Sequence, residues 1–163
     1  MPPEIQIRTA IPADASAIAT VLYDSFVAYK SSYTPEAFAA TTPTADQIEV
    51  RMSEGPVWVV VRDEKIVGTV AVVPRGASLY IRGMAVVPSA RGQKIGELLL
   101  THIESFATAR NFKRLYLSTT PFLSSAIRLY EHFGFQRNGE GPHDLLGTPI
   151  LTMEKRLELP TAD

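Results

Sequence analysis

The sequence contains no cysteine. This absence excludes a disulfide framework, a thiolate-ligated metal site and a covalent cysteine intermediate, and it is consistent with a reducing compartment. The chain also lacks a long hydrophobic run, because apolar stretches such as VWVVV are far too short to span a bilayer. The opening residues, MPPEIQIRTA, lack the basic and apolar regions of a signal peptide. We therefore expect a cytoplasmic protein that does not insert into a membrane.

An excess of charge of one sign is missing as well. The 163 residues include 16 basic and 17 acidic side chains, a formal net charge of -1, so no overall field favours nucleic acid. The chain is 45% hydrophobic and 20% charged, which is typical of a globular protein of one domain. We find no repeat, low-complexity tract or linker, and expect a single domain over residues 1–163. His143 and Asp144 have no second cluster to complete a metal site, so we predict none.

Hydrophobic periodicity predicts alternating strands and helices along the whole chain. Asp14 is a good N-cap for the first amphipathic helix, Ser124 can cap the last helix, and Gly134 stands where a helix commonly ends. The expected strands are residues 4–8, 57–62, 65–73, 78–87, 114–119, 135–138 and 149–157; the expected helices are residues 15–29, 35–40, 45–53, 95–110 and 124–133.

The strand–helix–strand unit over residues 78–119 should be parallel with a right-handed crossover, whereas the other neighbouring strands resemble hairpins. The sheet is therefore mixed, with helices on both faces. Ligands of such sheets collect at the carboxyl ends of parallel strands. Gly83 lies in the middle of one of these strands, where glycine indicates a bulge or the close approach of a ligand.

The stretch VVPSARGQKIGELLL, residues 86–100, places four unusual residues at the entrance to a helix: Arg91, Gly92, Lys94 and Gly96. Glycine and proline punctuate many ordinary strand-to-helix turns, and on this turn alone that reading is favoured. The alternative is an anion site. The first turn of a helix has unpaired N–H groups and a partial positive charge, and glycines allow a phosphate to approach the backbone.

Four stretches together resemble the GNAT N-acyltransferase superfamily: IRTAIPADASAI, MAVVPSARGQKIGELLL, AIRLYEHFGF and LTMEKRL. The second is similar to the family's pyrophosphate loop, (Q/R)-x-x-G-x-(G/A), and the third to its L-Y-x-x-x-G-F signature. The resemblance covers nearly the whole chain. It implies a single α/β (α+β) domain with a mixed, mostly antiparallel sheet of about seven strands. One parallel pair of strands would splay around acetyl-CoA, with CoA as the product.

The resemblance also implies which residues bind the cofactor. The pantetheine arm would add like a strand to the backbone near Met84, and one N–H group there would polarise the thioester carbonyl. Two positions depart from the family pattern, since Lys94 replaces the middle glycine of the loop and Leu123 replaces an asparagine. Ser124 or Ser125 could supply the hydrogen bond that Leu123 cannot. The expected cofactor-binding residues are Met84, Ala85, Val86, Arg91, Gly92, Gln93, Lys94, Gly96, Glu97 and Ser125.

Tyr130, in AIRLYEHFGF, is the expected catalytic residue, whose hydroxyl would protonate the departing CoA thiolate. The alternative is a core tyrosine, since Ile127 and Phe133 share its face. No general base stands out from the sequence. The candidates are Glu131, His143 and Asp144, with a base acting through water and the absence of a base equally open; His102 and His132 read as solvated helix residues.

The acceptor pocket should form from the segment after the first helix and from residues 139–148. Tyr29 and Tyr33 could line it, and Tyr80 stands where many relatives have a carboxylate. The resulting hypothesis is an acetyl-CoA-dependent N-acetyltransferase that acts on a small-molecule or peptide amine in a ternary complex, as a monomer or a homodimer. The alternatives are a non-catalytic acyl-CoA-binding or sensing domain and a nucleotide-binding domain. The last is disfavoured, because the turn lacks the GKS or GKT that would hold Mg²⁺.

Overall fold

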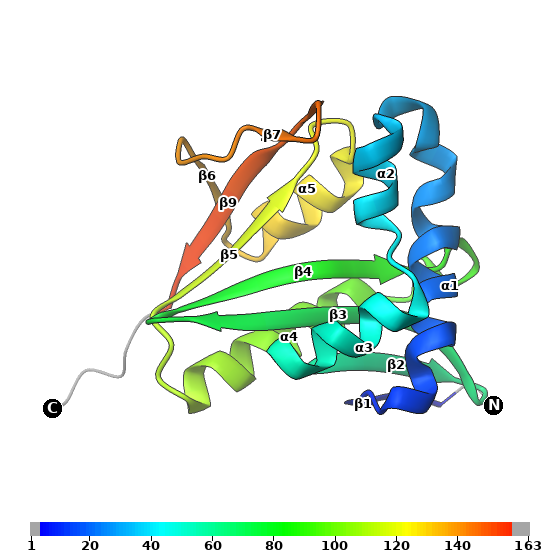
Figure 1. Ribbon diagram of the computed structural model, residues 1–163. Coiled ribbons are helices and arrows are strands. Elements are labelled where there is room, and N and C mark those ends of the chain that lie inside the picture. The colour runs from blue at the N-terminus through cyan, green and yellow to red at the C-terminus, as the bar shows by residue number, and fades with distance from the viewer. Residues whose placement is uncertain (1–3, 158–163) are drawn as a thin grey trace, which may run out of the picture.

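A computed structural model describes residues 4–157. Its main sheet has seven strands in the order β1-β2-β3-β4-β5-β9-β6, and β4 and β5 form its parallel pair (Figure 1). This confirms the expected α/β fold with a mostly antiparallel sheet. The strands are β1 (Ile5–Thr9), β2 (Val57–Arg62), β3 (Lys65–Arg75), β4 (Ser78–Val86), β5 (Arg114–Thr119), β6 (Gln136–Asn138) and β9 (Leu151–Arg156).

Helices cover both faces of the sheet (Figure 1). The helices α1 (Ala15–Phe26) and α3 (Ala45–Glu54) pack on one face, in a core that includes Ile18, Ile48 and Val59. The helices α4 (Ile95–Ala109) and α5 (Ser124–His132) pack on the other. A short helix, α2 (Pro35–Thr41), follows a 3-10 helix at residues 27–32 that periodicity did not predict.

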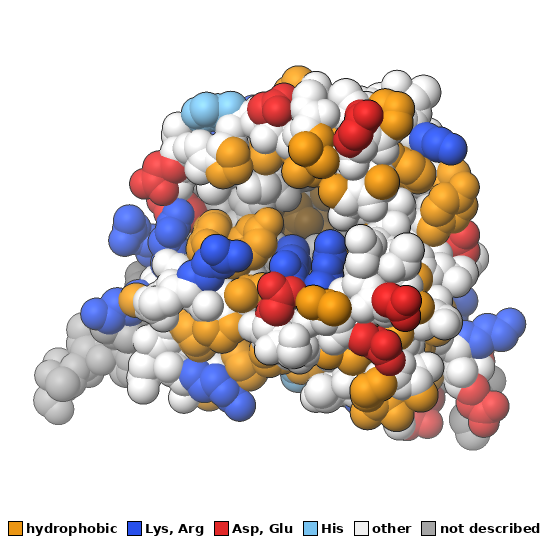
Figure 2. Space-filling view, viewed as in Figure 1, with side chains coloured by type: hydrophobic (Ala, Val, Ile, Leu, Met, Phe, Trp, Pro, Cys, Tyr) orange, Lys and Arg blue, Asp and Glu red, His pale blue; other side chains and the backbone are white. Residues whose placement is uncertain are grey.

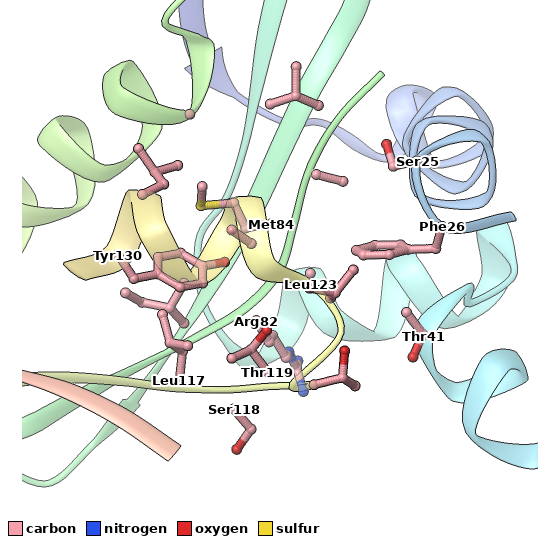
Figure 3. A pocket seen from close by; sticks show the side chains of 18 of the residues that line it. Ser25, Phe26, Thr41, Arg82, Met84, Leu117, Ser118, Thr119, Leu123 and Tyr130 are labelled. Carbon is pink, nitrogen blue, oxygen red and sulfur yellow. The ribbon is translucent and has the colours of Figure 1, made fainter. Parts of the chain in front are cut away.

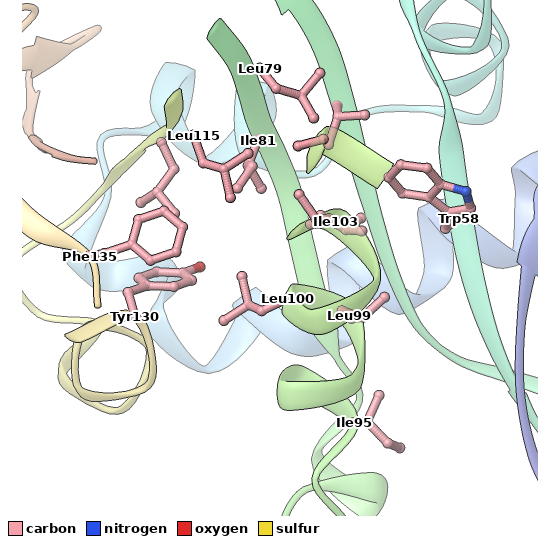
Figure 4. Close-up of a cluster of buried hydrophobic side chains, with 14 of the residues drawn as sticks. Trp58, Leu79, Ile81, Ile95, Leu99, Leu100, Ile103, Leu115, Tyr130 and Phe135 are labelled. Atoms are coloured by element: carbon pink, nitrogen blue, oxygen red, sulfur yellow. The ribbon is translucent and has the colours of Figure 1, made fainter. Parts of the chain in front are cut away.

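The larger core lies between the sheet and α4 (Figure 4). The buried side of α4 presents Leu99, Leu100 and Ile103, each almost fully buried. Their spacing of three and four residues is the apolar period that predicted the helix. Strands β4 and β5 contribute Leu79 and Leu115, while the opposite faces of these strands stay free to line a site. Within residues 4–157 no helix has both the length and the apolar character needed to cross a bilayer.

The parallel pair separates partway along its length. Strands β4 and β5 pair from Ser78 opposite Arg114 as far as Ile81 opposite Leu117, and then diverge (Figure 1). The pairing of β4 with β3 is irregular at the same level, and Gly83 there has a φ of +61°. A left-handed backbone is accessible to glycine without the steric cost that a Cβ imposes. The bulge expected at Gly83 is therefore present, and it bends the second half of β4 away from β5.

Of two predicted helix caps, one is right in position only and the other is wrong. Asp14 is the N-cap residue of α1, as expected, but its side chain makes no capping hydrogen bond; it accepts a hydrogen bond from Ile11 N at 2.8 Å and pairs with Arg8. Ser124 is the first residue of α5, and Leu123 occupies the cap position. Gly134 is confirmed as the residue after the C-cap, with a φ of +92°. A small second sheet, β7 (Asp144–Leu145) with β8 (Thr148–Pro149), forms inside a segment that we expected to be a loop.

Candidate active site

A cavity of about 800 Å³ occupies the space where β4 and β5 diverge. Its walls come from these strands, the end of α1, the start of α4, helix α5 and the loop that holds β7. In the space-filling view the middle of this face is hollowed, and Lys and Arg side chains lie along the rim of the hollow (Figure 2). The cavity therefore lies at the carboxyl ends of the parallel strands, the position expected for a ligand site.

One wall of the cavity is an unpaired strand edge. The N–H of Val87 donates to Val67 O at 2.9 Å, which fixes the orientation of the backbone toward β3. Because successive peptide groups of a strand point to opposite sides, the N–H and C=O groups of Met84 and Val86 point away from β3. Beyond Ile81 no described strand pairs with that side of β4. An extended ligand can hydrogen-bond there as an added strand.

A helix N-terminus forms the adjoining wall. The first turn of α4 leaves the N–H groups of Ile95 to Glu97 without partners in the helix. Lys94 precedes the helix with a φ of 62°, so the residue at the consensus glycine position has the left-handed backbone that glycine favours. Arg91 anchors the turn, since its Nη2 donates to Ser25 O at 3.2 Å. An anion would fit this arrangement, because the dipole of a 15-residue helix favours negative charge at its N-terminus.

Gly96 lines the cavity, but its nearest neighbour is another helix. A Cβ at this position would lie 2.7 Å from Leu129 Cδ2 of α5 and 3.6 Å from Met84 Cε. A side chain at this position would force the end of Leu129 to move, so glycine suits the close packing of α4 against α5 in addition to any need for space beside a ligand. Gln93 is absent from the lining residues, and its side-chain carbonyl accepts a hydrogen bond from Arg62 Nη1 at 2.7 Å.

Tyr130 joins the core to the cavity. Its side chain is buried, and its ring lies 5.9 Å from that of Phe135 between ring centroids. The hydroxyl points toward Met84 (Figure 3). Burial raises the pKa of Tyr130 to about 12, so the hydroxyl is neutral at pH 7 and can donate a hydrogen bond. The core and catalytic interpretations of Tyr130 are therefore compatible.

The rest of α5 that faces the cavity is mostly apolar. Leu123 lies inside the pocket, where the family pattern has an asparagine (Figure 3). Ser125 also lines the cavity, and its hydroxyl accepts a hydrogen bond from Arg128 Nη2 at 3.3 Å. Ser124 is not among the lining residues. Of the two serines, only Ser125 is placed to replace the missing amide.

The three tyrosines expected at the acceptor end all line the cavity. The ring of Tyr29 stacks on Phe122, and the ring of Tyr33 meets the same phenylalanine edge-on at 4.9 Å. Tyr80 lies on β4 with its ring 5.1 Å from that of Tyr116 on β5. Burial raises the pKa values of Tyr33 and Tyr80, so both phenols are neutral at pH 7.

Among the three candidates for a general base, only Asp144 lines the cavity. Its carboxylate accepts a hydrogen bond from Gly147 N at 3.0 Å. Glu131 and His143 are exposed outside it.

The two helix histidines differ in exposure. His132 is exposed as expected, but His102 is half-buried, with its ring 4.7 Å from that of Trp58, and burial lowers its pKa. Residues 4–157 contain no group of three His, Cys, Asp or Glu side chains that could hold a metal ion.

Two lining residues that carry charge were not predicted from the sequence. Arg51 comes from α3 and Arg82 from β4, and both face the cavity beside Tyr80. The alternation of β4 contains a signal for Arg82. Leu79 and Ile81 are apolar and buried, so Tyr80 and Arg82, which alternate with them, point to the opposite face. For Arg51 no sequence signal exists, since only the tertiary fold brings α3 to the bulge of β4.

The fold and this site together define an acyltransferase-like α/β domain, and comparison with known proteins identifies its family. Residues 19–135 match the Acetyltransferase (GNAT) family. The match extends over more than half of the chain, and the protein belongs to this family.

Among curated proteins, the chain is 36% identical to the uncharacterized N-acetyltransferase YjgM of Escherichia coli, over 48% of this chain and 50% of that protein. It is 31% identical to human N-acetylaspartate synthetase, over 61% of this chain and 34% of that protein. The alignments thus span half or less of the length of these relatives.

Solved structures share the fold at low sequence identity. PaiA N-acetyltransferase from Thermoplasma acidophilum, solved in complex with coenzyme A, has a TM-score of 0.82 and 16% identity, covering 94% of this chain and 99% of that chain. The ribosomal-protein-S18-alanine N-acetyltransferase from Escherichia coli has a TM-score of 0.76 and 14% identity, covering 98% and 99%. These likenesses confirm the architecture.

Proposed function

We propose that this protein transfers an acetyl group from acetyl-CoA to a primary amine. The observation that carries the proposal is one cavity that joins three features: the unpaired edge of β4, the N-terminus of α4 and the hydroxyl of Tyr130. Membership of the GNAT family supports it, and so does the CoA complex of PaiA.

The residues present fit an acyl-CoA thioester. The N–H groups of Ile95 to Glu97 would bind the pyrophosphate, with charge added by Arg91 and Lys94. The backbone of Met84 and Val86 would pair with the amides of the pantetheine arm. A backbone N–H of the same segment would then bind the thioester carbonyl and stabilise the negative charge that develops on its oxygen.

Reaction requires a neutral amine within reach of the thioester carbon. The amine nitrogen attacks that carbon, the C–S bond breaks, the sulfur departs with the electron pair, and the nitrogen loses a proton to water or a base. Tyr130, with a pKa of about 12, is a much weaker acid than a thiol, whose pKa is about 8.5. Its hydroxyl therefore stabilises the departing thiolate by donating a hydrogen bond, and need not surrender its proton. Holding both reactants in one cavity supplies most of the acceleration.

A second candidate function is a non-catalytic acyl-CoA-binding domain. It is favoured by the weakness of the acid–base machinery, since Asp144 is the one predicted base that lines the cavity and it is solvent-exposed. The relatives' printed names point to different acceptors, aspartate in one and an alanine of a ribosomal protein in another, so they do not select one for this chain. A cytoplasmic location and a homodimer stay predictions.

The test is a screen of primary amines with acetyl-CoA, in which free thiol release is followed and acetylated products are identified by mass. Acetyl transfer predicts thiol release that depends on the amine and is matched by product. If CoA binds but no amine in the screen increases thiol release above hydrolysis, the non-catalytic alternative replaces the transferase.

A further inference from the structure

Arg51 brings a positive charge to the cavity wall, and no described residue pairs with it directly. It extends from α3, is half-buried and lies against the bulge of β4, where a Cβ on Gly83 would be 3.1 Å from its Nη1. Within residues 4–157 its guanidinium makes no ion pair and no hydrogen bond. A guanidinium that has lost part of its hydration and makes no hydrogen bond within the described chain keeps N–H donors that a ligand in the cavity can use.

Arg82 adds a second guanidinium beside the first. Its Nη2 donates to Glu54 Oε1 at 2.8 Å, but its Nε is buried and has no hydrogen-bond partner in the described chain. Arg82 and Thr119 both line the part of the cavity where β4 and β5 separate (Figure 3). One donor of Arg82 is therefore satisfied, and its buried Nε is left without a partner.

The balance of charge at this end of the cavity is positive. Glu54 is the acidic partner of Arg82, and its side chain is 45% exposed, so solvent weakens its field. Burial lowers the pKa of Arg51, and the neighbouring charge of Arg82 lowers it further; the opposing effects of Tyr80 and Glu54 offset only part of this. Arg75 adds positive charge above the ring of Tyr80, 5.5 Å from its centroid. The two acidic residues that line the cavity, Glu97 and Asp144, pair with neither Arg51 nor Arg82.

We infer that the acceptor is a small amine that also carries a carboxylate, of the α-amino acid class, and that Arg51 and Arg82 bind this carboxylate. A guanidinium matches a carboxylate with two parallel N–H donors, and the contact would compensate the unpaired charge of Arg51. The inference rests on the proposed acetyl transfer, because it assigns the acceptor of that reaction.

The spacing along β4 favours a small molecule. Arg82 precedes Met84 by two residues, with the bulge at Gly83 between them, so their Cα atoms are at most about 7 Å apart. The backbone of Met84 to Val86 would hold the thioester carbonyl, so the carboxylate site and the reacting carbon lie a few bonds apart on the same strand. An amine and a carboxylate on one compact acceptor can reach both places.

The experiment compares each of a panel of L-amino acids with its L-amino acid amide, which keeps the amine and removes the carboxylate charge. For wild type, kcat/KM should favour the free acid by about 10–100-fold, the range of a hydrogen-bonded charge pair. Arg51→Gln should reduce this preference to within a few-fold, while Arg51→Lys should retain part of it. Arg137→Gln, an equal loss of charge at an exposed arginine of β6 outside the cavity lining, should leave the preference unchanged.

Thermal stability and acetyl-CoA affinity separate a role of Arg51 in binding the acceptor from a role in folding or in binding the cofactor. Thermal melting should show Arg51→Gln at least as stable as wild type, because the lost guanidinium has no partner, and the affinity for acetyl-CoA should not change. The assignment of the acceptor would be overturned if amides were acetylated as fast as the free acids or faster, and if Arg51→Gln did not change the ratio of the two kcat/KM values. Acetyl transfer itself would still be supported by that result. Failure of every amine would count against the transferase itself.

Discussion

At the scale of single residues, the hydroxyl of Tyr130 can be separated from its ring. Tyr130→Phe keeps the packing against Phe135 and removes only the group that would bind the departing sulfur. We expect kcat to fall by about 10–10³-fold, the lower range for a positioned acid or donor, with acetyl-CoA affinity within a few-fold. Thermal stability should change little, since no described residue hydrogen-bonds to this hydroxyl.

The matched control is Tyr116→Phe, which removes a phenol from the same face as Tyr80 but outside the cavity lining. Steady-state turnover at saturating acetyl-CoA should be close to wild type in this variant. A Tyr130→Phe enzyme with full kcat would leave Tyr130 as a core residue, and the C–S bond would then break without its help.

Lys94 allows the charge and the backbone of the α4 turn to be tested apart. At a φ of 62°, a non-glycine residue destabilises the folded state by about 1–2 kcal/mol. Glycine avoids this strain, but its greater freedom in the unfolded chain offsets part of the gain. We expect Lys94→Gly to raise the free energy of unfolding by about 0.5–1 kcal/mol, measured by denaturant titration. Lys94→Ala retains the strained backbone and should not be stabilised. Equal stability of the two variants would contradict this reading of the turn.

The same position shows what a family pattern can and cannot predict. The pattern marks residue 94 as glycine, and the structure supplies the physical reason in a left-handed backbone that this chain adopts with lysine. Gly96, in contrast, satisfies the pattern for a reason that the sequence does not reveal, because its neighbour is Leu129, a residue of another helix. A contact between two helices that are far apart in sequence cannot be obtained from a local motif.

At the scale of elements, the separation of β4 from β5 depends on the bulge at Gly83. Gly83→Ala would place a Cβ on a left-handed backbone and 3.1 Å from Arg51 Nη1. We expect a loss of about 1–3 kcal/mol in unfolding free energy and a weaker affinity for CoA, because relief of the strain would change the path of β4.

Gly76→Ala is the control for Gly83→Ala. Gly76 lies in the turn between β3 and β4 with a φ of +62°, and a Cβ there would meet nothing within 4 Å. Calorimetry should show destabilisation by both variants and weaker CoA binding only for Gly83→Ala. Normal CoA affinity in Gly83→Ala would mean that the bulge does not set the width of the gap.

The junction between β1 and α1 should depend on pH. Asp14 is buried, accepts hydrogen bonds from two Arg8 nitrogens at 2.7 and 3.0 Å, and has its pKa lowered chiefly by that contact. Because the pKa of Asp14 is lower in the folded state, its contribution to the free energy of unfolding is fully present above the pKa of the unfolded chain, about 3.9. That contribution is lost as the pH falls through the pKa of the folded state. Asp14→Asn should cost about 1–3 kcal/mol at pH 7. Melting curves at pH 7 and pH 2.5 should show this difference shrink, and a constant difference would contradict the assignment.

Most elements could be predicted from local pattern, and the exceptions have identifiable causes. The helix over Ile95–Ala109 follows from apolar residues that recur every three to four positions. The strands on either side of it follow from apolar residues that recur every second position. The β7–β8 hairpin, with two residues in each strand, is too short to leave such a period. Ser124 has the right chemistry for a cap, but the chain enters α5 one residue earlier, at Leu123.

At the scale of the whole molecule, the half of the site made from contiguous sequence was predictable and the other half was not. Residues of β4, the α4 turn and Tyr130 lie within recognisable motifs, and all but Gln93 of those expected line the cavity. The acceptor end is assembled from α1, α3 and the loop around Asp144. Arg51 illustrates the limit: it reads as an ordinary solvated helix residue until the fold places α3 against β4.

The central claim is that the cavity between β4 and β5 is a site for CoA and its thioesters, and ligand-dependent thermal melting tests it most directly. At a concentration about 100 times Kd, a ligand that binds only the folded state adds about 2.7 kcal/mol, or several degrees in Tm for a domain of this size. We expect CoA and acetyl-CoA to produce this shift and ATP and NAD to produce none, because the nucleotides lack the pantetheine arm that pairs with β4. Equal shifts with ATP and acetyl-CoA, or no shift with either, would contradict the account.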